Sequence, residues 1–389
     1  MIPYSRQNIN KRDILEVNKV LKSNFLTQGD KVSKFEKIVS NYTKAKYSIA
    51  VNSASSALHI ACLALGIKKK DIVWTVPNTF VASANCAIHC GAILDFVDID
   101  PDNWNISLIE LEKKLKIAKR KNKLPKLLIP VHFAGLPTDQ EKIWKLSKKY
   151  KFKILEDASH SIGAKFKGNI VGSCKWSDIT VFSFHPVKII TTGEGGMALT
   201  NDKNLAEKMR ILRTNGISQS NLIFKKNKNK PWYYEHQIPG FNYRMSDISA
   251  ALGISQFKRL KKFVLKRNLI AKKYKKYFKE LPVKFQKVEK NFYCSYHLFP
   301  IQLNFKRSKM DYAKIFKKLR SKKYHVNLHY MPVHLSPYFK KKGFNKGNFV
   351  NAEYYADTAI SIPIFFHLTD KNILKIVKTV KSFFYETSK

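Results

Sequence analysis

The segment that decides the fold reads Val181-Phe-Ser-Phe-His-Pro-Val-Lys188-Ile-Ile-Thr-Thr-Gly193-Glu-Gly-Gly196. Its apolar start predicts a strand over 179–184, and a second short strand is expected over 196–199. A single lysine, Lys188, lies between them, followed by glycines that let the backbone turn sharply. A lysine shielded from water loses part of its preference for the charged form, so its neutral amine becomes available to attack an aldehyde. A lone lysine beside a glycine turn is more often structural, so its role depends on its surroundings.

Strand-like and helix-like stretches alternate from about residue 45 to residue 200, which predicts a mostly parallel α/β sheet. We expect strands over 47–51, 71–76, 92–97, 127–131 and 153–156, with helices over 55–65, 79–90, 108–117 and 138–150. Sheets of this kind bind ligands at the carboxyl ends of their strands. The residues that follow each strand are therefore the candidates for a functional site.

The chain after this sheet predicts a second, smaller unit. Residues 217–240 read as irregular, and helical spacing resumes at 246 and can run to about 278. A strand near 297–303, a helix near 310–321 and a closing helix near 370–385 then indicate a small α+β lobe. We expect a large ligand-binding domain over residues 1–245, and a long helix with a small C-terminal domain over 246–389.

Two polar residues follow the predicted strand at 153–156. Asp157 comes directly after it, where an exposed carboxylate would meet a bound ligand. Such a carboxylate can keep a pyridine nitrogen protonated, as pyridoxal phosphate requires. His160, three residues on, could stack on the ring or hydrogen-bond near its oxygen. Taken alone, Asp157 could equally be a helix cap and His160 a buried structural histidine.

The strand at 47–51 leads into a turn of small residues, Asn52-Ser-Ala-Ser-Ser-Ala57, at the start of a predicted helix. Free backbone N–H groups, the positive end of the helix dipole and the hydroxyls of Ser55 and Ser56 suit a phosphate, although a plain helix cap explains the turn as well. Ser183 could bind the same phosphate, and Phe80 could cover a ring face. Phosphate turn, aromatic, aspartate, serine and lysine follow in the order that a fold type I pyridoxal-phosphate enzyme requires.

Along nearly its entire length the chain resembles the DegT/DnrJ-type sugar aminotransferases. The matching stretches are Leu26-Thr-Gln-Gly29, Phe35-Glu36, Asn52-Ser-Ala-Ser-Ser-Ala57, Glu156-Asp-Ala-Ser-His160, Ser183-Phe-His-Pro-Val-Lys188, Thr192-Gly-Glu-Gly-Gly196, Gly240-Phe-Asn-Tyr-Arg-Met-Ser-Asp247 and His329-Tyr-Met-Pro332. Within the family it is most similar to the group that aminates the 4-keto intermediate of pseudaminic acid synthesis. That finer resemblance is carried by Trp232-Tyr-Tyr-Glu235, Ser295-Tyr-His-Leu-Phe299 and Val333-His334.

The resemblance implies a role for each candidate residue. Lys188 would bond pyridoxal phosphate covalently, Asp157 would be the partner of its pyridinium, and Phe80 and His160 would flank its ring. Ser55, Ser56 and Ser183 would bind the phosphate, and Asn242 would contact the phosphate bound by the other subunit of a homodimer. The sugar-nucleotide site would be lined by Tyr4, Thr27, Gln28, His329 and Tyr330. The catalytic set would be Lys188, Asp157 and His160.

The resemblance also implies a reaction: glutamate as amino donor, a nucleotide-linked 4-keto-6-deoxy sugar as acceptor, and Lys188 as the base that moves the proton. Some relatives carry histidine in place of this lysine and dehydrate their substrate, so Lys188 argues against dehydration. Ile189 stands where a proline is frequent, and Asn215 where histidine is frequent. The departure at Asn215 leaves the identity of the acceptor sugar open. The alternative acceptor is another UDP- or dTDP-linked keto sugar, of the perosamine or bacillosamine type.

Composition bears on the remaining function classes. The 389 residues are 44% hydrophobic, without the roughly twenty-residue apolar run that a membrane span needs, and the first six residues lack a secretion-signal layout. The net charge of +44 could indicate a nucleic-acid-binding or regulatory protein, yet ten of the 72 basic residues are arginine and the lysines are scattered. We expect mainly a solvated surface, with no nucleic-acid or membrane partner. Five cysteines without a metal-binding spacing favour free thiols in the cytoplasm, and no metal site is expected.

Overall fold

A computed structural model describes residues 1–218, 230, 232–308 and 310–384. Half of the irregular segment predicted over 217–240, namely 219–229 and 231, lies outside the described residues. No helix among those described is long and apolar enough to cross a membrane.

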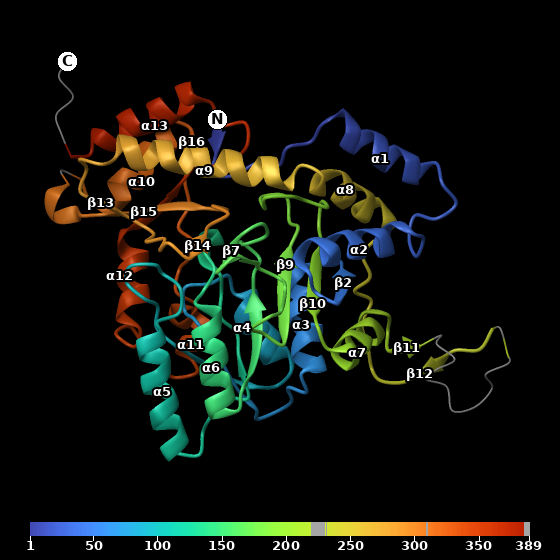
Figure 1. The fold of residues 1–389 in the computed structure, drawn as a ribbon. Coiled ribbons are helices and arrows are strands. Elements are labelled where there is room, and N and C mark those ends of the chain that lie inside the picture. Colours follow the sequence, from blue (N-terminus) through green and yellow to red (C-terminus); the bar gives the residue numbers. More distant parts are fainter. Residues whose placement is uncertain (219–229, 231, 309, 385–389) are drawn as a thin grey trace.

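A seven-stranded sheet forms the centre of the molecule (Figure 1). In spatial order its strands are β2 (Tyr47–Val51), β10 (Gly196–Thr200), β9 (Ile179–Ser183), β6 (Lys153–Asp157), β5 (Leu127–Leu128), β3 (Ile72–Thr75) and β4 (Ile93–Phe96). β10 is antiparallel to both of its neighbours, and the pairs from β9 to β4 are parallel. The predicted α/β class is therefore confirmed, with one reversed strand.

Helices cover this sheet, and polar residues in the preceding loops mark where most of them begin. They are α3 (Ala54–Ala64), α4 (Ala82–His89), α5 (Leu108–Arg120), α6 (Gln140–Tyr150) and α7 (Lys203–Arg213). Ser107, Asp139 and Asp202 each accept a backbone N–H at the helix start, which satisfies a donor that the helix leaves unpaired. The strands between them are buried on both faces, as parallel strands usually are.

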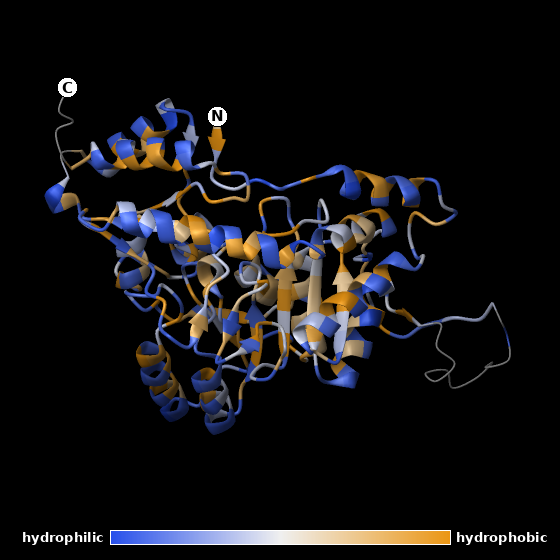
Figure 2. Ribbon diagram, turned by 45° about the horizontal axis from the view of Figure 1, so that its top comes forward, coloured by the Kyte–Doolittle hydropathy of each residue, from blue (hydrophilic) through white to orange (hydrophobic). Residues whose placement is uncertain are grey.

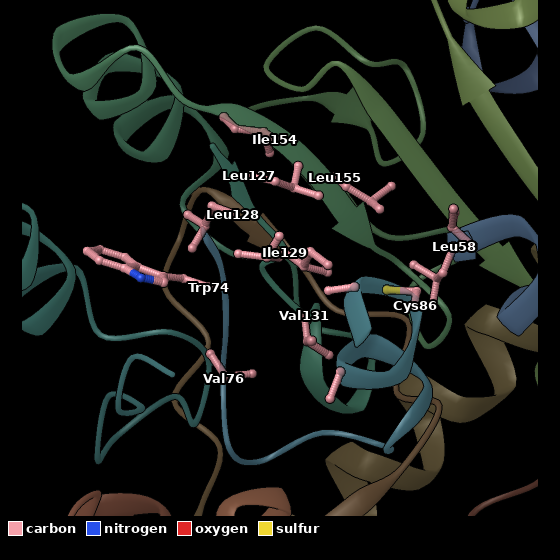
Figure 3. Packing of buried hydrophobic residues seen from close by; sticks show 14 of the residues in the cluster. Leu58, Trp74, Val76, Cys86, Leu127, Leu128, Ile129, Val131, Ile154 and Leu155 are labelled. Carbon is pink, nitrogen blue, oxygen red and sulfur yellow. The ribbon is translucent and has the colours of Figure 1, made fainter. Parts of the chain in front are cut away.

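The main core lies between the parallel strands and the helices that cover them. Figure 3 shows a part of it, contributed by β3, β5, β6 and their extensions and by α3 and α4: Leu58, Trp74, Val76, Cys86, Leu127, Leu128, Ile129, Val131, Ile154 and Leu155. Hydrophobic residues concentrate in the strands, and hydrophilic residues on the outer helix faces (Figure 2). Burial of these side chains fixes the positions of the strand ends that carry the site.

The helix predicted to run unbroken from 246 to 278 is two helices, α8 (Asp247–Phe257) and α9 (Leu260–Tyr277). The N-terminal helix α1 (Lys11–Leu21) packs against α8. Its buried Asp13 accepts hydrogen bonds from Ser255 and Gln256 of α8 and pairs with Arg259 in the break. Helical periodicity alone could not indicate this break, because its partner lies more than 200 residues earlier.

The C-terminal elements form a second layered unit around the antiparallel sheet β13 (Val283–Phe285), β15 (Phe299–Leu303) and β17 (Ala359–Ile362). Helices α10 (Tyr312–Ser321), α12 (Val350–Thr358) and α13 (Asp370–Lys381) accompany it. In Figure 1, α9 crosses the molecule with α10 and α13 at one end and α8 at the other. The two ends of α9 belong to different hydrophobic clusters. The domain boundary at 245/246 remains a prediction.

Short elements complete the fold. They are β1 (Ile2–Pro3), α2 (Lys31–Thr43), β7 (Lys165–Phe166), β8 (Asn169–Ile170), β11 (Ile217–Ser218), β12 (Glu235–His236), β14 (Phe292–Tyr293), β16 (Tyr324–His325) and α11 (Pro337–Lys340). β1 pairs with β16, so the N-terminus lies beside the C-terminal unit. This pairing places the residues after β1 and after β16 near the same end of the molecule.

Candidate active site

A cavity of about 460 Å³ lies where β2, β3, β6 and β9 end. The N-terminal segment and the loop 327–330 form the rest of its wall. Nine of the residues predicted from the sequence line it: Tyr4, Ser55, Phe80, Asp157, His160, Ser183, Lys188, His329 and Tyr330. The carboxyl edge of the sheet therefore brings most of the predicted set into one place, as expected for an α/β fold.

Lys188 follows β9 in a tight turn, in which its N–H bonds to the His185 carbonyl at 2.9 Å. The preceding carbonyl, of Val187, accepts a hydrogen bond from Ser5 Oγ at 2.7 Å, which ties the turn to the N-terminal segment. Burial lowers the pKa of the Lys188 amine from 10.5 to about 8, against the opposing attraction of Asp157. Roughly a tenth of the amine is therefore neutral at pH 7, and more at higher pH, which nucleophilic and proton-transfer chemistry needs.

Asp157 ends β6 and is 5% exposed. Its Oδ2 accepts a hydrogen bond from Ser83 Oγ at 2.6 Å, and its Oδ1 accepts one from the Ser159 N–H at 3.1 Å. Ser83 lies on α4, so helix and strand together fix the carboxylate. Two donors to one carboxylate hold it in a single orientation at the wall of the cavity.

The turn before α3 presents free hydrogen-bond donors. Ser53 caps the helix by accepting the Ser56 N–H at 3.1 Å. No hydrogen bond among the described residues engages the N–H groups of Ala54 and Ser55, so this helix start is suited to an anion. A Cβ on Gly196 would lie 2.4 Å from the Ser53 carbonyl oxygen, so glycine is needed for β10 to pass this closely.

Ser56 differs from the other predicted phosphate ligands. Its hydroxyl donates to Asn52 Oδ1 at 2.7 Å and lies 2.9 Å from Ser53 Oγ, and the residue is not among those that line the cavity. In this arrangement Ser56 supports the turn, while Ser55 and Ser183 face the cavity.

Three histidines gather beside Lys188. Burial, followed by the charge of Lys188, lowers the pKa of His329 to about 3, and the same causes take the pKa values of His160 and His297 well below the ordinary value. The rings of His160 and His297 lie 4.5 Å apart, and His329 Nδ1 lies 2.9 Å from Ser361 Oγ. All three imidazoles are therefore neutral near neutral pH, and Lys188 is the group there that can gain or lose a proton.

Three predicted residues besides Ser56 lie outside the cavity of this single chain. Thr27 and Gln28 belong to the turn before α2, where the Leu26 carbonyl accepts the Asp247 N–H at 2.9 Å. The carbonyl of Asn242 accepts a hydrogen bond from Asn52 Nδ2 at 3.4 Å, so Asn242 lies beside the phosphate turn but outside the cavity wall.

Two functional candidates were missed at the sequence level. Ser83 gave no signal, because it sits within a helix, 74 positions from the carboxylate it contacts. Arg267 of α9 is buried and donates to the carbonyls of Tyr296, His297 and Ile364 at 2.9–3.1 Å and to Ser5 Oγ at 3.2 Å. A lone arginine in a lysine-rich helix carries no pattern that would reveal this.

The residues that line the cavity fit pyridoxal phosphate. An amine with a lowered pKa, a fixed carboxylate and an anion-binding helix start face the same cavity. No group of three or more metal-ligating side chains occurs in the part of the chain that the structure describes.

Comparisons with known proteins point the same way. The model of the DegT/DnrJ/EryC1/StrS aminotransferase family matches residues 7–381. A relative from Campylobacter jejuni, named UDP-4-amino-4,6-dideoxy-N-acetyl-beta-L-altrosamine transaminase, is 39% identical over 93% of this chain and 92% of its own.

Two solved structures share the fold along the whole chain. Helicobacter pylori PseC, an aminotransferase involved in the biosynthesis of pseudoaminic acid, is 30% identical, with a TM-score of 0.88 and coverage of 98% of this chain and 99% of its own. Spr1654 from Streptococcus pneumoniae, described as a candidate sugar aminotransferase and solved in a PLP form, is 27% identical, with a TM-score of 0.88 and 98% coverage of both chains.

Proposed function

The chain belongs to the DegT/DnrJ/EryC1/StrS aminotransferase family, and we propose that it transfers the amino group of glutamate to a nucleotide-linked 4-keto-6-deoxy sugar. As a member of this family it is a pyridoxal-phosphate-dependent sugar aminotransferase. The proposed product is UDP-4-amino-4,6-dideoxy-N-acetyl-beta-L-altrosamine, an intermediate of pseudaminic acid synthesis. The observation that carries this choice of sugar is the 39% identity, over 93% of the chain, to a transaminase named for that product.

The site supports the transamination itself. When bound, pyridoxal phosphate supplies an aldehyde that takes up the donor's amino group and a protonated ring that draws electrons from the reacting carbon. Asp157, held by Ser83 and the Ser159 N–H, would accept a hydrogen bond from the ring nitrogen and keep it protonated. Nζ of Lys188 would take up and release the proton at the substrate carbon, for which a pKa of about 8 is well matched to neutral pH.

The phosphate would be held by the start of α3 with Ser55, and by Ser183 at the end of β9. Phe80 lines the cavity and is 58% exposed in this chain, so a ring bound against it would cover apolar surface. His160, which also lines the cavity, would flank the same ring. Tyr4, His329 and Tyr330 are left to contact the sugar.

We further propose a homodimer with shared active sites, in the cytoplasm. Asn242, Thr27 and Gln28 lie outside the cavity of one chain, and a second copy would bring them to it. Leu26 and Phe25, which precede Thr27, are 45% and 62% exposed, so apolar surface is open to a partner there. The cysteines are free thiols, which is usual in a reducing compartment.

The test is product analysis with purified, cofactor-loaded protein and a panel of UDP- and dTDP-linked keto sugars, with glutamate as donor. We expect turnover of the UDP-linked 4-keto-6-deoxy sugar, with a product whose mass and NMR spectrum show an amine at C4. Faster turnover of a dTDP-linked or 3-keto sugar would overturn the proposed substrate but leave the proposed amino transfer standing. Absence of amino transfer from any donor, together with tight, salt-dependent DNA binding, would favour the nucleic-acid alternative.

A further inference from the structure

The hydroxyl of Tyr330 lies in the cavity wall, 3.0 Å from Nε2 of His160. The other nitrogen of that imidazole, Nδ1, accepts the backbone N–H of Ala134 at 3.3 Å. An imidazole nitrogen that accepts a hydrogen bond carries no proton, so the two contacts of His160 together determine its tautomer.

His160 is neutral, because burial and the charge of Lys188 hold its pKa well below the ordinary value. With Nδ1 unprotonated, its single ring proton is on Nε2. Nε2–H therefore donates to the Tyr330 oxygen, and Tyr330 is the acceptor in this contact. The hydroxyl proton of Tyr330 must then be directed somewhere other than His160.

No acceptor for that proton occurs among the described protein groups, since His160 is the one hydrogen-bond partner found for the Tyr330 hydroxyl. The ring is fixed on several sides. The backbone N–H of Tyr330 donates a hydrogen bond to Asn78 Oδ1 at 3.0 Å. The centroid of the Tyr330 ring lies 6.1 Å from that of Phe80 and 6.5 Å from that of Phe133. Burial raises the pKa of the Tyr330 phenol, so it keeps its proton, and the cavity beside Lys188 is the space left for it.

We propose that Tyr330 is a catalytic hydrogen-bond donor to an oxygen of the bound reactants, and that His160 is the positioning residue that aims it. This rests on the proposed function. The oxygen is the carbonyl oxygen of the keto sugar or the ring oxygen of pyridoxal phosphate, both of which are acceptors. Donation to the carbonyl oxygen makes the sugar carbon more electrophilic toward the incoming nitrogen, whereas donation to the ring oxygen changes the acidity of the lysine-bound cofactor. By analogy with the loss of one oxyanion donor, removing the hydroxyl should slow the affected step by about 100-fold.

The test compares wild type and Tyr330→Phe as cofactor-loaded proteins. The half-reactions with glutamate and with the keto sugar are each followed in a single turnover by absorbance. Slowing confined to the keto-sugar half-reaction identifies the sugar carbonyl as the acceptor. Slowing of both, together with a shift of at least about one pH unit in the spectral titration of the lysine-bound cofactor, identifies its ring oxygen. Both half-reactions within twofold of wild type, with an unshifted titration, would overturn the proposal.

Failure of the proposed function would look different, because wild type itself would then leave the keto sugar unchanged. The role of Tyr330 would still be tested in that case, by comparing wild type and Tyr330→Phe in the glutamate half-reaction and in the spectral titration. Tyr355→Phe is the matched control. Tyr355 is buried in the same aromatic cluster, with its ring 5.7 Å from Phe133, and its hydroxyl has no partner among the described residues and lies outside the cavity wall. We expect this variant to remain within twofold of wild type in both half-reactions. An equal loss in Tyr355→Phe and Tyr330→Phe would show a packing effect and overturn the proposal.

The positioning role of His160 has its own readout. His160→Gln retains an N–H donor that can reach Tyr330, whereas His160→Leu removes it. We expect the rate of the Tyr330-dependent half-reaction to be at least tenfold higher in the glutamine variant than in the leucine variant. Nitrogen-15 NMR of wild type should identify Nδ1 of His160 as the unprotonated nitrogen. Equal losses in the two variants, or a protonated Nδ1, would remove His160 from the proposal.

Discussion

The buried amine of Lys188 predicts a measurable instability of the cofactor-free protein. Its pKa falls from 10.5 to about 8 on folding, because burial disfavours the ammonium more than Asp157 favours it. The folded chain therefore binds fewer protons than the unfolded chain between these two values. At about 1.4 kcal/mol per tenfold change, the ammonium lowers the free energy of unfolding by about 3 kcal/mol at pH 7 and by about 1 kcal/mol at pH 10.

The perturbation is Lys188→Met, which keeps an unbranched side chain of similar length and removes the charge. We expect the variant to be more stable than wild type by about 3 kcal/mol at pH 7, as an upper estimate, with the gap narrowing as the pH rises to 10. The difference in the free energy of unfolding is measured by urea unfolding of the two cofactor-free proteins. Both are used at the same concentration and without cofactor, because cofactor binding and assembly would add their own stability. Lys37→Met, on the exposed face of α2, is the control and should change stability by less than about 0.5 kcal/mol at every pH.

Two results would refute this reasoning. Equal stability of Lys188→Met and wild type at pH 7 would mean that the ammonium is solvated in the folded protein. A gap that persists unchanged from pH 7 to pH 10 would mean that the gain comes from packing of the methionine and not from loss of a charge. Either outcome would also remove the physical basis for a neutral amine at the site.

Three further substitutions test the supports of the site. Gly196→Ala places a Cβ 2.4 Å from the Ser53 carbonyl oxygen, so we expect at least about tenfold weaker cofactor binding in an absorbance titration and a loss of about 2 kcal/mol in urea unfolding. Ser83→Ala removes the 2.6 Å hydrogen bond to Asp157 and should lower the free energy of unfolding by about 2 kcal/mol, with a fall in kcat for glutamate-driven amino transfer. Arg267→Met leaves three carbonyls without their charged donor and should cost about 3 kcal/mol in urea unfolding.

Much of the fold followed from the sequence, because the strands of a parallel sheet are short apolar runs with recognisable ends. The strand predicted over 47–51 is β2 (Tyr47–Val51), and the one predicted over 153–156 is β6 (Lys153–Asp157). Correct strand ends also located the site, since the residues just beyond them line one cavity. Six of the nine residues that line it, Ser55, Phe80, Asp157, His160, Ser183 and Lys188, could therefore be placed there by position along the chain, whereas Tyr4, His329 and Tyr330 came from the family resemblance.

What the sequence could not give are contacts between distant segments. Asp13 pairs with Arg259 in the break between α8 and α9, and Ser83 donates a hydrogen bond to Asp157. Neither residue stands in a periodic pattern or a motif that relates it to its partner. Ser56 illustrates the same limit within a motif, because its hydroxyl is bound by Asn52 while its neighbour Ser55 faces the cavity.

The charge of the cavity differs from that of the chain as a whole. The chain carries +44, yet among the described residues that line the cavity Lys188 is the single lysine and there is no arginine. The lining also includes Asp157 and Glu194. A second ammonium there would oppose protonation of Lys188 further and compete with the cofactor's ring nitrogen for Asp157. Histidines held neutral by burial provide hydrogen-bonding groups without adding that charge. This explains why the amine of Lys188 is surrounded by imidazoles and the phenol of Tyr330, and not by further lysines, in so basic a protein.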